Sequence, residues 1–255
     1  MAEKAAEQNM IRFGPSEKEE RRFALIRRIV TAVLALFFVP LVIALGVLEW
    51  DDRHFYIISA AIILLSTIPF FIVFEKRRPL AREITLIAVL VALGTAGRAA
   101  FYMLPQFKPI AAVVIIAGCS LGCEAGFITG ALTIFVSNMF FGQGPWTPWQ
   151  MFALGLVGFF AGLIFRREIR TKLGLFLLCL YGALSVLVIY GGIVDTSYVF
   201  TASRTVTLSS FLAAYASGLP FNLIFAGATV IFLLLLAKPL LNKLARIKLK
   251  HGVFR

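Results

Sequence analysis

Histidine, cysteine and charged residues are all scarce in this sequence of 255 residues. Only 15% of the residues are charged, whereas soluble domains carry about 25%. The two histidines, His54 and His251, lie in loop or terminal positions, so a Ser–His catalytic pair or a multi-histidine metal site is not expected. The three cysteines are an odd number and lie in apolar segments, which disfavours a secreted disulfide framework.

A phosphate-binding loop is also missing. The sequence contains no G-x-x-x-x-G-K-[ST] motif, whose backbone amides and lysine hold nucleotide phosphates in P-loop ATPases. Any energy taken from ATP would therefore have to come through a partner protein.

Apolar residues are abundant and occur in long runs. They make up 60% of the chain, and the mean hydropathy is +0.91. A membrane-spanning helix needs about 20 such residues, so we predict an all-α, polytopic membrane protein with about eight transmembrane helices. The predicted apolar runs are 24–48, 55–74, 84–104, 109–141, 149–165, 173–194 and 209–236.

The run at 109–141 is too long for one span and short for two. It carries a glycine at every fourth position from Gly118 to Gly130, with Glu124 among them. We interpret it as a tight helical hairpin, which brings the number of spans to eight.

The positive charges indicate the topology. The formal net charge is +12, from 25 basic and 13 acidic residues. With the N-terminus inside, all basic residues except Arg53, Arg98, Lys108 and Arg204 fall on the cytoplasmic side, as the positive-inside rule requires. Both termini are therefore predicted to be cytoplasmic, and the charge is not interpreted as a nucleic-acid surface.

The third outer loop, residues 138–150, has an unusual composition. Its sequence, NMFFGQGPWTPWQ, combines aromatic rings, amides, glycine and proline. This composition suits a shaped surface with a few hydrogen-bonding groups that could bind a ligand. The alternative is an aromatic belt at the membrane interface.

Two kinds of small-residue stripe are present. Alanines recur every four residues in the run from residue 84, and such spacing lets helices approach closely in lipid. The partner of this alanine face could be an internal helix or another protein. The glycine stripes of the hairpin and of the following span favour internal packing. The alanine stripe consists of Ala88, Ala92, Ala96 and Ala100.

Two charged residues, Arg98 and Glu124, fall within predicted spans, where charges are functional candidates by default. Arg98 lies about one turn from the outer end of its span, so it could either snorkel to the headgroups or line a cavity. Glu124 lies near the turn of the hairpin, where it could be solvated or cap a helix.

The segments RAAFYMLPQFKP (98–109) and FFGQGPWTPWQMF (140–152), with the glycine-spaced hairpin between them, resemble the substrate-binding S component of energy-coupling factor (ECF) vitamin transporters. The similarity covers about residues 82–241. It implies a six-helix core at 79–241, preceded by a polar tail at 1–22 and by a helix pair at 23–78 that standard S components lack. A basic tail at 242–255 follows.

The resemblance implies a non-enzymatic subunit in a prokaryotic cell membrane, with no cofactor and no metal. It would bind a vitamin at the outer face and dock, through the alanine stripe, on a transmembrane coupling subunit powered by two ATPase subunits. The substrate-binding residues implied by position are Arg98, Phe101, Tyr102, Gln106, Lys108, Asn138, Gln143, Trp146, Trp149, Gln150, Asp195, Tyr198, Arg204, Tyr215 and Asn222.

The substrate prediction is cobalamin or a related corrinoid, because amides and tryptophans with few charges suit a large, mostly neutral ligand. The main alternative function is a stand-alone secondary transporter of a small organic solute. An intramembrane enzyme is a third class, but it would need a base beside a nucleophile such as Ser137 or Ser217, and the sequence offers none.

Overall fold

The computed structural model describes residues 81–165, 171–202 and 206–251, together with residues 67, 71, 74, 75 and 169. The helix pair predicted at 23–78 lies almost wholly outside these residues. The described elements are all helical: α5 (Ala81–Ala100), α6 (Ile110–Leu121), α7 (Cys123–Phe141), α8 (Thr147–Ile164), α9 (Lys172–Leu184), η2 (Ser185–Gly191), α10 (Gly192–Ala202) and α11 (Leu208–His251).

Within the described part of the chain, five helical stretches are long and apolar enough to cross a membrane: Ala81–Ala100, Cys123–Phe141, Thr147–Ile164, Lys172–Thr201 and Leu208–Lys250. The fourth stretch is continuous because the π-helical segment η2 joins α9 to α10. The prediction of an all-helical membrane protein is confirmed for the described residues, and the predicted total of eight spans stays a prediction.

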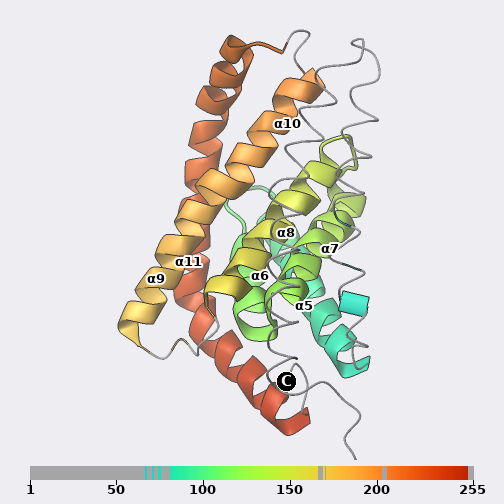
Figure 1. The fold of residues 1–255 in the computed structure, drawn as a ribbon, viewed down its shortest axis with the longest axis vertical. Helices are drawn as coiled ribbons and strands as arrows, with labels where there is room; N and C mark the ends of the chain where they lie inside the picture. The colour runs from blue at the N-terminus through green and yellow to red at the C-terminus, as the bar shows by residue number, and fades with distance from the viewer. Residues whose placement is uncertain are drawn as a thin grey trace, which may run out of the picture.

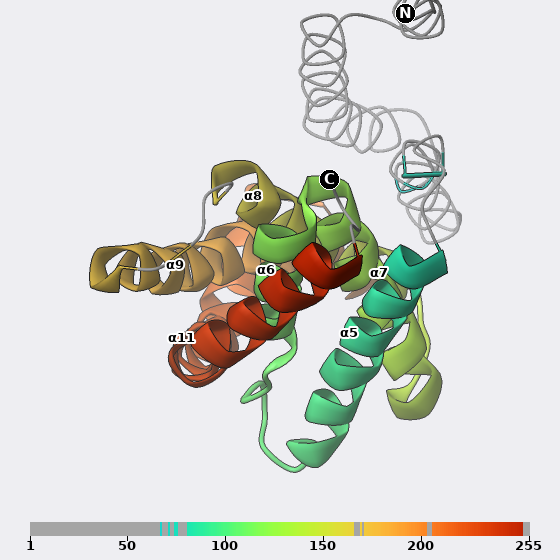
Figure 2. The same cartoon turned by 90° about the horizontal axis from the view of Figure 1, so that it is seen from below.

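The hairpin predicted at 109–141 consists of α6 and α7, which are separated by the single residue Gly122. Gly122 has a φ of 100°, a backbone conformation that is readily accessible to glycine. Helix α6 has 12 residues, about 18 Å of helix, which is less than the roughly 30 Å of a bilayer core. Its residues from Ala111 to Ala117 are at most 1% exposed, and Figure 2 shows α6 at the centre of the bundle.

Glycines allow α6, α7 and α8 to pack backbone against backbone. A Cβ atom added at Gly126 would lie 2.5 Å from the Gly158 carbonyl oxygen, and one added at Gly130 would lie 2.5 Å from the Leu154 carbonyl oxygen. Side chains cannot occupy such spaces, so the glycine stripes serve close packing inside the bundle, as small residues do in membrane proteins.

The rod formed by α9, η2 and α10 runs beside α11 along one side of the molecule (Figure 1). Helix α11 continues past the predicted end of its span at 236 as far as His251 and contains Pro220 and Pro239. Figure 1 shows a change of direction in the lower part of α11, and a proline within a helix is a common cause of such a bend. Beyond the bend, Lys248 Nζ donates to the Ser120 carbonyl oxygen at 2.7 Å, near the C-terminal end of α6.

Glu124 lies in the first turn of α7 and is 3% exposed. The alternative of a solvated side chain is therefore wrong. A carboxylate in this position is favoured by the partial positive charge of the helix N-terminus. The sequence alone could not place Glu124 at a helix N-terminus, because that placement depends on the hairpin turn being at Gly122.

Candidate functional site

Arg98, near the end of α5, is the centre of a polar network. Its Nη1 atom donates to Ser137 Oγ and to Asn138 Oδ1, both at 2.6 Å. The guanidinium thus points toward α7, and it does not reach outward to the headgroups. Because a buried charge is costly unless it is hydrogen-bonded, these two acceptors explain why an arginine is tolerated here.

Asn138 extends the network to α8. Its side chain is buried, and Nδ2 donates to Thr147 Oγ1 and to Gln150 Oε1, both at 3.0 Å. With the bond from Arg98, the amide makes three of the four hydrogen bonds available to it. The network therefore ties α5, α7 and the start of α8 together at one end of the bundle.

Gln150 is the residue of this network with spare donors. It is half-buried, and its NH2 group has no hydrogen-bond partner among the residues that the structure describes. The hydrogen bond from Asn138 holds the Gln150 side-chain carbonyl oxygen in place. The two N–H groups of the same amide are therefore held in a defined position, where they can donate to acceptor atoms of a ligand.

Aromatic rings cover the outer side of Arg98. The guanidinium carbon lies 5.4 Å from the centre of the Phe141 ring, within the range of a cation–π contact. Tyr102 stacks on the same ring at a centroid distance of 4.9 Å. The predicted residue Tyr102 therefore lies over the arginine network, with Phe141 between them.

A second polar group joins α10 to α11. Asn222 Nδ2 donates to Asp195 Oδ2 at 2.7 Å, and the hydroxyls of Thr196 and Tyr215 lie 2.8 Å apart. Tyr215 also donates to the Gly192 carbonyl oxygen at 3.1 Å. The structure thus brings three predicted residues, Asp195, Tyr215 and Asn222, into one cluster.

Tyr190 is linked to a member of each polar group. It belongs to the π-helical segment η2 and is close enough to interact electrostatically with both Arg98 and Asp195. Its ring packs edge-on against Phe225 at 5.1 Å. Because π-helical segments often occur at functional sites, we include Tyr190 in the candidate site.

Trp149 is 1% exposed and stacks on Phe200 at a centroid distance of 5.9 Å. Its indole Nε1 is buried and has no hydrogen-bond partner in the part of the chain that the structure describes. Native proteins rarely leave a buried donor without an acceptor. The indole is therefore a candidate for a hydrogen bond to a bound molecule.

The loop between α5 and α6 adds an aromatic cluster and a cation. Phe101 packs against Phe107 and Phe232 at 6.0 and 5.1 Å. Lys108 beside them is half-buried, and burial, with a smaller effect from nearby Arg98, lowers its pKa. The two cations therefore repel each other, which favours the approach of an electronegative group.

Other predicted residues lie apart from these clusters. Gln143 Nε2 donates to the carbonyl oxygen of Phe135 in the preceding helix α7. Gln106 lies in the loop between α5 and α6 and has a left-handed backbone conformation, with a φ of 54°. Trp146 and Tyr198 are 44% and 59% exposed. Arg204 lies outside the described residues.

Several members of the site were not predicted from the sequence. Ser137 bonds Arg98, and Thr147 bonds Asn138. Both are polar residues close in sequence to predicted site residues, and this could have marked them as members of the site. Tyr190, Phe107 and Phe200 lie in or near apolar runs, where a single aromatic residue looks like ordinary core or lipid-facing packing.

The four alanines of the stripe are all exposed on α5, whereas Ile87, Leu90, Val91 and Gly94 of the same helix are buried. The described bundle therefore does not use the alanine face for internal packing. Among the described residues, no group of histidine, cysteine, aspartate and glutamate could hold a metal ion.

One comparison with known proteins gave a match. The family model described as "ECF-type riboflavin transporter, S component" matches residues 80–245. No curated protein and no solved structure matches the chain. The matched range contains all the described helices from α5 to α10 and most of α11.

Proposed function

Because the chain belongs to the S-component family of ECF transporters, we propose that it binds riboflavin or a closely related flavin for import. The family makes the protein a multi-pass membrane subunit of a vitamin transporter and not an enzyme. Its partners are a transmembrane coupling subunit and ATPase subunits, in keeping with the missing phosphate-binding loop. The match of the family model over residues 80–245 is the observation that carries the flavin assignment.

The chemistry of the site supports a flavin. An isoalloxazine ring is flat and carries carbonyl and ring-nitrogen acceptors on one edge. Gln150 and Trp149 offer donors that lack partners among the described residues, and Arg98 adds positive charge beside them. These groups match the acceptors of a flavin better than they match a hydrocarbon ligand.

The second cluster supports the same substrate. The ribityl chain of a flavin carries several hydroxyls, each able to donate and to accept. Asp195, Asn222 and Tyr215 provide a carboxylate, an amide and a hydroxyl within one group. Tyr190 interacts electrostatically with Asp195 of this cluster and with Arg98, so we propose that the ring lies near Arg98 and the chain near Asp195.

The prediction of a corrinoid substrate finds no support, since the matched family is named for riboflavin. The inference from composition failed because tryptophans and amides are equally suited to any large heteroaromatic ligand. We retain the predicted orientation, with the site at the outer face and both termini cytoplasmic, as part of the proposal.

Titration of the full-length, ligand-free protein with riboflavin and with cobalamin tests the assignment. We expect saturable quenching of riboflavin fluorescence and no binding of cobalamin. Asn138→Ala should weaken riboflavin binding about 10- to 100-fold, because it leaves Arg98 without one of its acceptors. Gln143→Ala is the matched control, because Gln143 carries the same amide group but its side chain bonds only the Phe135 carbonyl oxygen of the preceding helix. This variant should bind riboflavin normally. Binding of cobalamin in place of riboflavin would refute the proposal.

A further inference from the structure

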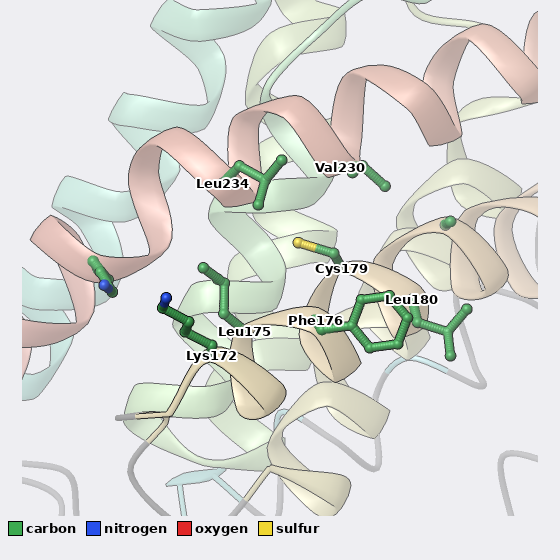
Figure 3. A pocket seen from close by; sticks show the side chains of 9 residues that line it. Lys172, Leu175, Phe176, Cys179, Leu180, Val230 and Leu234 are labelled. Carbon is green, nitrogen blue, oxygen red and sulfur yellow. The ribbon is translucent and has the colours of Figure 1, made fainter.

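A groove of about 420 Å³ lies between α9 and α11, away from the candidate site. It is lined by apolar side chains and by two lysines, Lys172 and Lys238. Figure 3 shows Leu175 and Cys179 of α9 facing Val230 and Leu234 of α11. Cys179 forms its floor at 7% exposure, and the rim residues Phe176 and Leu234 are 62% and 54% exposed.

Both lysines lie at the same end of this groove. Lys172 begins α9, whereas Lys238 lies in the second half of α11. The two helices run in opposite directions, since α11 returns beside the rod that begins at Lys172 (Figure 1). Figure 3 shows Lys172 beside Leu175, on the side away from Cys179. Neither lysine makes an ion pair or a hydrogen bond with a described residue.

The length of the groove matches one leaflet of a bilayer. The lining residues of α9 run from Lys172 to Ala183, which is about 16 Å of helix. The hydrocarbon core of a bilayer is about 30 Å thick. The groove is therefore about as long as half of that core, and Lys172 is the first residue of a helical stretch long and apolar enough to span it.

We propose that this groove binds one anionic phospholipid of the inner leaflet. One acyl chain lies between α9 and α11, and the phosphate of the headgroup lies between Lys172 and Lys238. Charge selects the occupant, because two cations without a partner among the described residues, at the mouth of an apolar groove, favour an anionic headgroup over a zwitterionic one. Basic pockets between transmembrane helices on the cytoplasmic side bind anionic lipids in this way, and the distribution of basic residues predicts that this end is cytoplasmic.

Native mass spectrometry of the full-length protein, after exchange into phosphatidylglycerol or phosphatidylcholine, tests the proposal. We expect the wild type to retain one phosphatidylglycerol in preference to phosphatidylcholine. The K172Q/K238Q variant should lose this preference by up to about 30-fold, because each lysine near the surface contributes about fivefold. A183F, which fills the groove, should lower the retention of both lipids.

The matched control is K243Q/K250Q, which removes two exposed lysines of α11 that do not line the groove. It should retain the preference of the wild type. An equal loss in this control would mean that only the overall positive charge attracts the lipid, and would overturn the proposal. So would a preference that is unchanged in K172Q/K238Q, or a retention of both lipids that is unchanged in A183F; either result would leave the groove for a protein partner. Thermal unfolding of each variant reports its folding, so a failure of the flavin assignment would not change the lipid result.

Discussion

Arg98 shows how a single residue can connect separate helices. Its guanidinium donates a hydrogen bond to Asn138 of α7, and the Asn138 side chain in turn donates to Thr147 and Gln150 at the start of α8. The charge, the amides and the aromatic loop made Arg98, Asn138 and Gln150 predictable from the sequence. The choice between an inward and an outward arginine was not predictable, because it depends on where Ser137 lies in space.

The hydroxyl groups of Tyr215 and Tyr198 allow a test of where the ligand binds. Tyr215→Phe removes a hydroxyl that contacts Thr196 and Gly192, so we expect the dissociation constant for riboflavin to rise about 3- to 10-fold. Tyr198→Phe removes a hydroxyl for which the structure shows no hydrogen bond, and should leave the constant unchanged. Isothermal titration of the two variants measures both values. Equal effects would argue against the placement of the ligand beside α10 and α11.

At the scale of elements, the sequence predicted the hairpin correctly but not the role of its first helix. A stretch of 33 residues with spaced glycines has no other simple arrangement in a membrane. That α6 would be a short and almost wholly buried core helix could not be predicted from its apolar sequence, since a lipid-facing helix has the same apolar composition. The distinction arises from α8 and α11, which cover it.

The glycine contacts predict a strong position dependence for stability. Gly158→Ala would place a methyl group against the Gly126 backbone, which cannot move aside, so we expect destabilisation of about 1–3 kcal/mol. Gly227→Ala in α11 meets nothing within 4 Å and should be neutral or stabilise the helix by up to about 1 kcal/mol. Thermal unfolding of the two variants measures the difference. A similar melting temperature for both would contradict the close packing of α7 and α8.

The exposed alanines of α5 predict a separation of binding from transport. Ala92→Trp and Ala96→Trp should abolish uptake by the complete transporter, because bulky side chains prevent the close approach of a partner helix. Riboflavin binding by the isolated variants should stay normal, since these positions are exposed in the described bundle. Leu177→Trp, at an exposed position of α9, is the control for a large residue on the surface. Loss of binding in the alanine variants would show that the stripe packs within this chain.

For the whole molecule, composition and charge were sufficient to predict a helical membrane protein, whereas the orientation inferred from the charges stays a prediction. They were not sufficient to predict its substrate. The proposed site takes its groups from α5, α7, α8, η2, α10 and α11, and their juxtaposition is a property of the folded bundle. The helix pair predicted at 23–78 adds a separate question, because it lies outside both the family match and most of the described residues.

The central claim is that this chain is a flavin-binding S component, and its ligand can be identified directly. The measurement is mass spectrometry of the small molecule that co-purifies with the full-length protein from bacterial membranes, without added vitamin. We predict riboflavin, bound by the wild type and largely lost from Asn138→Ala. A corrinoid or another vitamin in its place, retained equally by both proteins, would contradict the account.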